Sequence, residues 1–207
     1  MKFVNHIEHP LIKKVNDALD KCTLCKDRNT RGGNFISHNT FDIDYFFISQ
    51  NPGFSNWNKQ CHPSDIIPFG LHEENQYHQF FDFFVEEYEK KFKSQPKCYI
   101  TNIVKCVTYK NSIPDQEMTD NCVREYLLKE IMAFKTFSKK PFEIFVVGKA
   151  SNDTMINLKK KYSLNIPFKH IYHPGYLNRQ GPEFVKNYAK KLFESKTENK
   201  RNQLFRK

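Results

Sequence analysis

The chain has 207 residues, a length that allows one compact domain with a substantial buried core. Its net charge of +10 and its 15% of aromatic residues suit a partner with a phosphate backbone and stacked bases. No apolar stretch is long enough to span a bilayer, and Met1–Leu11 lacks the apolar core of a signal peptide. These features exclude membrane-spanning and secreted classes, so we expect a cytoplasmic protein with reduced thiols.

Short β-rich runs alternate with helix-length segments, a pattern typical of a parallel sheet covered by helices on both faces. We therefore predict an α/β fold, a three-layer α/β/α sandwich around a central four-stranded parallel sheet. It would form a single domain over residues 1–195, followed by a basic tail over 196–207. The helices are expected near residues 10–21, 73–92, 115–137, 149–161 and 182–195. The predicted strands are Tyr45–Ser49, Cys98–Ile103, Phe142–Val147 and Phe168–Tyr172.

Helix start signals support three of these boundaries. Asp115 follows Pro114 at the start of the helix over 115–137, and Glu183 follows Pro182 at the start of the last helix. The cap of the helix over 149–161 is expected at one of three polar residues, Ser151, Asn152 or Asp153.

Four cysteines in two pairs are the most informative feature of the chain. Two residues separate Cys22 from Cys25, and fifteen separate Cys106 from Cys122, which lies inside a predicted helix. A pair of thiolates on one turn can bind a metal centre, and a second pair from elsewhere in the fold would complete a four-sulfur site. The spacing is compatible with a tetrahedral zinc ion and with an iron-sulfur cluster, and it does not choose between them. Buried thiols or disulfides are the remaining interpretation, which a cytoplasmic protein disfavours.

Polar residues, prolines and glycines follow every predicted strand. In a parallel α/β sheet, ligands bind beyond the carboxyl ends of the strands, so these positions are where chemistry is expected. No Gly-rich phosphate loop of the Walker or dinucleotide type is present, which argues against an NTPase or a dehydrogenase. The segments concerned are Gln50–Gly53, Asn102, Gly148–Ser151 and His173–Tyr176.

Five motifs in this order resemble the uracil-DNA glycosylase superfamily, and in particular its iron-sulfur branch. Together they span residues 22–176. The resemblance implies an α/β/α fold, hydrolysis of the bond between a base and deoxyribose in DNA, and a monomeric enzyme. It also implies a structural 4Fe-4S cluster held by Cys22, Cys25, Cys106 and Cys122. The motifs are Cys22-x-x-Cys25, Ser49-Gln-Asn-Pro-Gly53, Pro68-Phe-Gly70, Thr101-Asn-Ile-Val-Lys-Cys106 with Cys122 beyond it, and His173-Pro-Gly175.

The chemistry of base excision gives a role to individual residues of these motifs. A base buried in a duplex must be flipped into a pocket, where Phe69 would stack on it and the amide of Asn102 would read its edge. Bond cleavage leaves negative charge on the base, which His173 would stabilise by donating a hydrogen bond. Asn51 would hold the attacking water, and Gln50 would form part of the pocket wall.

The first motif departs from the iron-sulfur branch, which usually carries Gly-Glu-Ala-Pro-Gly, and from the best-known uracil enzymes, which carry an Asp that activates water. Asn51 instead resembles the mismatch-specific and single-strand-selective branches, in which an uncharged side chain orients water. Gly53 leaves space beside C5 of the base, where the most uracil-selective branch has a bulky residue. Together with the long segment 54–67, these departures predict a C5-modified pyrimidine, such as those of virus genomes, as the substrate.

Four further residues follow the strand ends and are candidates for DNA contacts, namely Lys149, Ser151, Tyr176 and Arg179. Tyr176 or Leu177 would wedge into the gap left by the flipped base.

Two other functions stay open at this point. The loss of an acidic residue from the first motif is compatible with an idle iron-sulfur module that binds damaged or single-stranded DNA. A zinc protein with another role in nucleic-acid processing is the second alternative. Cys61 and Cys98 fall outside the four-ligand set and are interpreted as a loop thiol and a buried strand residue.

Overall fold

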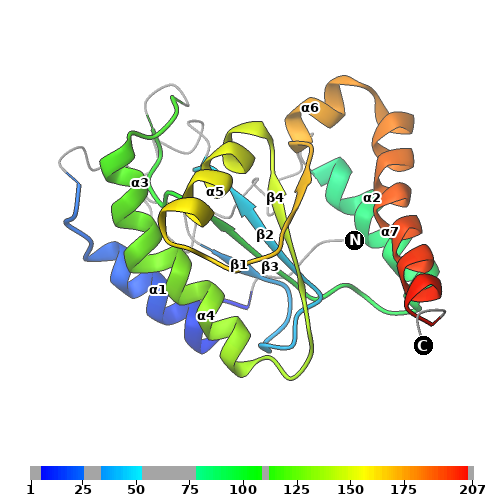
Figure 1. The fold of residues 1–207 in the computed structure, drawn as a ribbon, viewed down its shortest axis with the longest axis horizontal. Helices are drawn as coiled ribbons and strands as arrows, with labels where there is room; N and C mark the ends of the chain where they lie inside the picture. The colour runs from blue at the N-terminus through cyan, green and yellow to red at the C-terminus, as the bar shows by residue number, and fades with distance from the viewer. Residues whose placement is uncertain (1–5, 26–33, 53–77, 109–111, 205–207) are drawn as a thin grey trace. The chain divides into compact units, whose positions relative to one another are not determined.

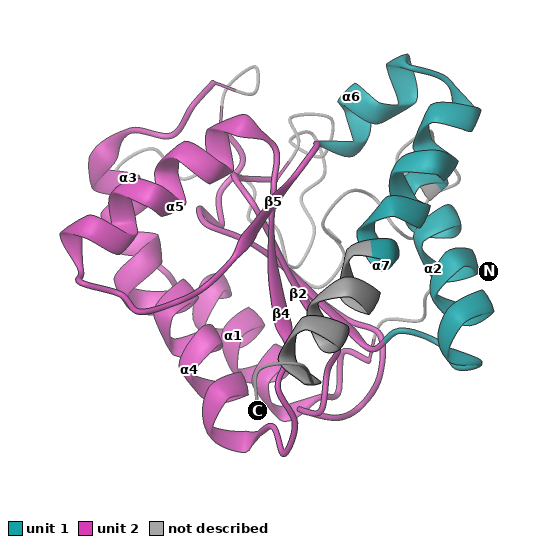
Figure 2. Cartoon of the chain, turned by 45° about the vertical axis from the view of Figure 1, so that its right-hand side comes forward, with its two compact units in different colours: residues 1, 73–96, 173–207 teal, residues 2–72, 97–172 magenta. Residues whose placement is uncertain are grey.

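The computed structural model describes residues 6–25, 34–52, 78–108 and 112–204. The chain divides into two compact units (Figure 2). The sheet unit comprises residues 2–72 and 97–172, and the helical unit comprises residues 1, 73–96 and 173–207. Because each unit is described by itself, the expected single domain over residues 1–195 stays a prediction.

A mostly parallel sheet of five strands forms the centre of the sheet unit (Figure 1). The strand order is β1-β3-β2-β4-β5; all neighbours pair in parallel except β1, which is antiparallel to β3. The α/β class and the four predicted parallel strands are confirmed, whereas β1 is an addition, because two residues are too short to give a periodic signal. The bounds are Phe35–Ile36 for β1, Tyr45–Ser49 for β2, Cys98–Asn102 for β3, Glu143–Val147 for β4 and Lys169–Ile171 for β5.

Both faces of this sheet are buried, as expected for parallel strands. On one face Phe46 packs its ring against Tyr99 and Phe134, with centroid distances of 4.8 and 5.4 Å. On the other face Tyr45 stacks on Phe145 at 5.2 Å. Such aromatic pairs contribute about 0.5–1.5 kcal/mol each beyond the area they bury.

The helices of the sheet unit contribute to the core on the Phe46 face. The expected helix over 115–137 is confirmed, but a π-helical turn divides it directly after Cys122. Asp115 caps its first turn as predicted, because its carboxylate accepts a hydrogen bond from the Met118 N–H at 2.7 Å. The bounds are Pro10–Asp20 for α1, Gln116–Cys122 for α3, Val123–Leu127 for η5, Leu128–Phe137 for α4 and Lys149–Lys161 for α5.

The predicted cap of α5 is wrong. Gly148 occupies the N-cap position with a φ of 87°, a conformation that glycine adopts without strain, and no side chain caps the helix. Ser151 lies inside the first turn, where its hydroxyl donates to the Val147 carbonyl at 2.8 Å.

The helical unit consists of α2 (His78–Phe92), α6 (Pro174–Arg179) and α7 (Pro182–Leu204). Helices α2 and α7 run side by side in Figures 1 and 2, and the rings of Phe84 and Phe193 meet between them at 5.0 Å. The short helix α6 was not predicted, and α7 continues past the expected end at residue 195 into the predicted tail. None of the described helices is long and apolar enough to cross a membrane.

Candidate functional site

The carboxyl ends of β2 and β3 hold three of the predicted site residues at one edge of the sheet. Ser49 is paired with Asn102 in the parallel register. Beyond the strands, the Ile103 N–H donates to the Ser49 carbonyl at 2.8 Å, and the Val104 N–H donates to the Gln50 carbonyl at 2.9 Å. These hydrogen bonds fix the backbone of the segments that carry the side chains of Gln50, Asn51 and Asn102.

Two buried amide atoms at this edge have no hydrogen-bond partner among the residues that the structure describes. The Asn102 side chain is 2% exposed and its Nδ2 donor is unsatisfied, while Gln50 is 9% exposed and its Oε1 acceptor is unsatisfied. An unpaired buried polar group costs about 1–3 kcal/mol, so natural proteins retain few of them. An unused donor and an unused acceptor at the ends of neighbouring strands are what a polar ligand such as a base edge would satisfy.

The Asn51 side chain is held in one orientation by its amide nitrogen. Nδ2 donates to the Pro52 carbonyl at 3.1 Å and to the Thr108 hydroxyl at 3.0 Å. The Thr108 hydroxyl in turn donates to the Ser112 carbonyl at 2.5 Å. No described residue donates to the Asn51 Oδ1, so this oxygen is the end of the amide that can accept a hydrogen bond from water.

His173 is the N-cap of α6 in the helical unit, two residues after β5 ends. Its Nδ1 accepts a hydrogen bond from the Gly175 N–H at 3.1 Å. In a neutral ring with Nδ1 as an acceptor, the proton is on Nε2, which makes Nε2 a donor. Burial, and secondly the charge of Arg179, lower the pKa of His173 below its ordinary value of 6.5. The ring is therefore neutral at pH 7 and can donate one hydrogen bond without carrying charge.

Three buried or half-buried histidines predict acid-sensitive stability. Burial is the main cause that lowers the pKa of His9, His38 and His173 below 6.5 in the folded chain. Between 6.5 and these lower folded values, the unfolded chain binds protons that the folded chain does not, so acid favours unfolding. We expect the melting temperature to fall as the pH drops from 7.5 to 5, and to fall less in the His38→Gln variant. Equal pH slopes for wild type and variant in thermal unfolding would contradict the assignment to His38.

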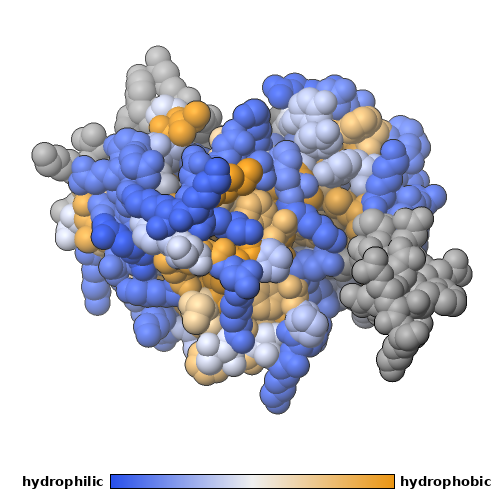
Figure 3. All heavy atoms as spheres, in the orientation of Figure 1, coloured by the Kyte–Doolittle hydropathy of each residue, from blue (hydrophilic) through white to orange (hydrophobic). Residues whose placement is uncertain are grey.

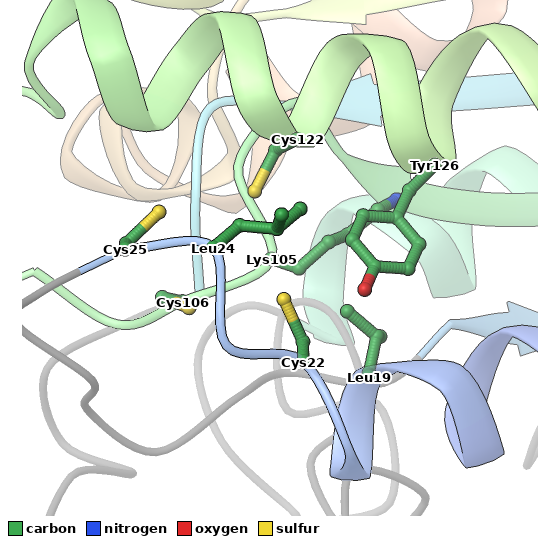
Figure 4. Close-up of a pocket in the computed structure, with 8 residues that line it drawn as sticks. All are labelled: Leu19, Cys22, Leu24, Cys25, Lys105, Cys106, Cys122 and Tyr126. Carbon is green, nitrogen blue, oxygen red and sulfur yellow. The ribbon is translucent and has the colours of Figure 1, made fainter.

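The four predicted metal ligands line one cavity of the sheet unit (Figure 4). Cys22 and Cys25 follow α1, Cys106 lies in the loop after β3, and Cys122 is the last residue of α3. Their sulfur atoms face the space between these segments in Figure 4. None of the five cysteines in the described part of the chain forms a disulfide. Within that part, no three His, Cys, Asp or Glu side chains converge as a single metal ion requires.

Polar contacts hold the segments of this cavity together. The Asn121 amide donates to the Leu24 carbonyl at 3.2 Å, and the Tyr126 hydroxyl donates to the Ala18 carbonyl at 3.4 Å. Burial raises the pKa of the Cys122 thiol to about 11, against the opposing effect of the Lys105 backbone N–H that bonds to its sulfur. A centre bound by thiolates would therefore displace protons from this site as it loads.

A buried ion pair lies beside the cavity. Lys105 lines the cavity, and its Nζ lies 2.7 Å from the Glu130 carboxylate, with both side chains at most 1% exposed. Thr101 joins this pair, since its hydroxyl donates a hydrogen bond to the Glu130 carboxylate at 2.8 Å and accepts one from the Lys105 ammonium. The sequence pattern assigns no role to these residues. Lys105 lies within a recognised motif, but nothing in the sequence pairs it with Glu130.

The residues predicted to contact DNA differ in how exposed they are to solvent. The side chain of Lys149 is 86% exposed and that of Tyr176 is also exposed, as a DNA contact requires, and Arg179 lies on the surface of α6. Ser151 is only 2% exposed and donates to a carbonyl, so its burial argues against the predicted DNA contact. Leu177 is fully buried, which leaves Tyr176 as the wedge candidate. Gly53, Phe69 and Cys61 lie outside the described residues.

The surface on the face drawn in Figure 3 is mostly hydrophilic. Helix α5 ends in three consecutive lysines, Lys159, Lys160 and Lys161, which add to the basic character of the chain. Lys161 forms an ion pair with Asp120 at 2.5 Å, so part of this positive charge is neutralised within the protein.

The mostly parallel sheet, with amide side chains at the carboxyl ends of β2 and β3, defines an α/β protein. A model of the uracil DNA glycosylase superfamily matches residues 37–195, which is most of the chain, and the protein belongs to this superfamily. Its members are DNA glycosylases, so the general class of activity is removal of uracil-like bases from DNA. A search of curated proteins finds no match to the chain.

Proposed function

We propose that the protein is an iron-sulfur DNA glycosylase of this superfamily that acts as a monomer in the cytoplasm. It would flip a uracil-like or C5-modified pyrimidine out of DNA and hydrolyse its N-glycosyl bond. The observation that carries the proposal is the orientation of Asn51. No described residue donates to its oxygen, and Asn51 follows the strand next to the one that ends at Asn102, whose Nδ2 is unsatisfied within the described residues.

The reaction follows from these groups. The Asn102 amide would satisfy its unused donor on the flipped base, and Phe69 would stack on the ring. The Asn51 oxygen would accept a hydrogen bond from water and so aim a water lone pair at the sugar carbon. As the carbon–nitrogen bond breaks, its electron pair goes to the base, and the His173 Nε2–H would stabilise the oxygen of the departing anion. The water oxygen becomes the new hydroxyl of the abasic sugar, and its released proton balances the charge of the base.

An uncharged Asn51 orients water but does not take its proton. Most of the rate enhancement must therefore come from stabilising the leaving base, which gives His173 the larger electrostatic role. A neutral donor suits this role, because it stabilises the anion without holding a permanent ion pair in the buried site.

The four cavity cysteines fit a four-sulfur centre. Cys22, Cys25, Cys106 and Cys122 come from three segments and line the same cavity, and thiolates are the preferred ligands of both zinc and iron-sulfur clusters. When bound, a 4Fe-4S cluster would supply a rigid covalent link between these segments and no redox step. The resemblance of the five motifs to the iron-sulfur branch favours the cluster over zinc, and a brown protein that contains iron and sulfide instead of zinc would agree with this choice.

The substrate can be identified with a panel of oligonucleotides that carry uracil, thymine opposite guanine, hydroxymethylcytosine or a sugar-bearing derivative of it. After incubation and alkali treatment, strand scission at the modified position reports an abasic site. We expect scission on at least one member, with a larger C5 substituent tolerated because of Gly53. Folded, cluster-loaded protein that produces no scission on any member would overturn the proposal.

Substitution of the two proposed catalytic side chains distinguishes an enzyme from a binding module. We expect Asn51→Ala and His173→Ala each to lower the single-turnover excision rate by about 10²- to 10³-fold, because each removes one preorganised hydrogen bond of the transition state. The dissociation constant for the same oligonucleotide should change little, since both groups act on the reacting atoms.

Matched controls are available in the same unit as His173 and on the sheet. Asn187→Ala alters an exposed amide of α7, and His170→Ala alters an exposed histidine of β5. Both should keep the wild-type rate. The idle-module alternative requires that wild type and all four variants bind DNA equally and release no base.

A further inference from the structure

The hydrogen bonds around Asn51 fix which end of its amide faces the site. The two ends of an Asn side chain have nearly the same size and shape, so packing alone does not distinguish them. Here both hydrogen bonds that the Asn51 amide makes with described residues involve the nitrogen. Nδ2 donates to the Pro52 carbonyl, which can only accept, and to the Thr108 hydroxyl.

Thr108 can accept from Asn51 because its own proton is already used. A hydroxyl has one proton to donate, and Thr108 directs it to the Ser112 carbonyl at 2.5 Å. Its lone pairs therefore face the Asn51 amide, which must present its nitrogen. The Thr108 side chain is 5% exposed, so water does not readily replace it.

The orientation of this amide decides what it does to water. With Oδ1 outward, Asn51 accepts a hydrogen bond from water and leaves a water lone pair directed at the sugar. With Nδ2 outward, the amide would donate to water, occupy that lone pair and oppose attack. An error of this kind, or a displacement of about 1 Å, can cost roughly 10²-fold in rate.

We propose that Thr108 is a positioning residue that acts through Asn51, holding the amide oxygen toward the attacking water and matching the site to an amide instead of a carboxylate. The inference rests on the proposed function for the role of Asn51. Thr108 contacts neither water nor base in this proposal. The same arrangement explains why an Asp at position 51 would not suit this chain. Its carboxylate would face the lone pairs of Thr108 and the Pro52 carbonyl.

The first test is a double-mutant cycle on single-turnover excision. We expect Thr108→Val to lower the rate by about 10- to 100-fold with little change in DNA affinity, and Thr108→Ser, which keeps the hydroxyl, to stay within about 3-fold of wild type. In the Asn51→Ala background, Thr108→Val should have no further effect, because the group it positions is gone. Multiplicative effects of the two substitutions, or equal losses in Thr108→Val and Thr108→Ser, would overturn the inference.

A matched control separates positioning from folding. Thr119 is also 5% exposed and also donates its hydroxyl to a carbonyl, that of Asp115 at 2.8 Å, but it has no contact with Asn51. Thr119→Val should lower the melting temperature about as much as Thr108→Val and leave the excision rate unchanged. A comparable loss of rate in both variants would show that the effect of Thr108→Val is general destabilisation.

A second readout does not depend on turnover. The side-chain NH₂ signals of Asn51, assigned by their loss in Asn51→Ala, should exchange with solvent at least about 10-fold faster in Thr108→Val than in wild type, because one hydrogen bond is lost. Equal exchange rates would overturn the inference even if the enzyme is active. Absence of excision by wild type, with the exchange difference present, would instead count against the proposed function alone.

Asn51→Asp tests the matching of Thr108 to an amide. We expect this variant to be slower than wild type at pH 7, although an Asp could act as a base, since repulsion from Thr108 and Pro52 disfavours the carboxylate. A rate equal to or above that of wild type would contradict the proposed match.

Discussion

Replacing any one cavity cysteine with serine is expected to remove the visible absorbance of an iron-sulfur cluster and to lower the melting temperature by about 10 °C or more. The four thiols come from the segment after α1, the loop after β3 and the end of α3, which are far apart in sequence. A metal centre that links these segments does not bind when one of its ligands is removed. Its binding then no longer contributes to the free energy of folding. For a chain of this length, each kcal/mol shifts the melting temperature by about 2–4 °C.

Cys98→Ser is the control for this series. Cys98 is a buried thiol of β3 that does not line the cavity, so its substitution costs some packing but leaves the proposed ligands intact. The colour and the iron content of this variant should equal those of wild type. A cavity variant that keeps full iron and sulfide content, or a Cys98 variant that loses both, would disprove the ligand set.

Lys105→Met is expected to lower the free energy of unfolding by about 3–5 kcal/mol, because it leaves the Glu130 carboxylate buried without its cation. Glu130→Leu should be comparably costly for the same reason. The double variant should recover much of the loss, since two apolar side chains in place of a buried ion pair are often nearly neutral. Urea unfolding of the four proteins measures these differences.

An exposed ion pair on α2 is the control for the buried pair. Lys90 bonds to Glu86 at 2.5 Å on the surface of α2, and both side chains are about half exposed. Lys90→Ala should therefore leave the midpoint of urea unfolding close to that of wild type. If Lys105→Met lowers stability to urea no more than Lys90→Ala does, the buried pair does not hold the loop between β3 and the cavity.

This buried pair also connects two parts of the candidate site. Thr101 precedes Asn102 at the end of β3, and Lys105 precedes Cys106, so the network anchors the loop between the residue proposed to read the base and a proposed metal ligand. Damage to the pair is expected to reduce both cluster retention and excision, whereas Thr108→Val should reduce excision alone.

Much of the fold was predictable because its signals are local. β2, β3 and β4 are rich in aromatic and β-branched residues, and Asp115 caps its helix within three residues of itself. The errors occurred where a local signal was weak or ambiguous. β1 and α6 are short, and a left-handed glycine, Gly148, replaced the polar cap expected for α5.

By itself the sequence determined the fold class, the superfamily motifs and the cysteine set, because each depends on residue type and order along the chain. Only the tertiary structure brought Thr108 to Asn51 and Glu130 to Lys105, and only it showed that Ser151 is buried while Tyr176 is exposed. Such pairings join residues up to dozens of positions apart, and burial depends on every neighbour in space. Neither quantity has a periodic or spacing signal in the sequence, so the positioning of the proposed catalytic amide emerged only when the chain was folded.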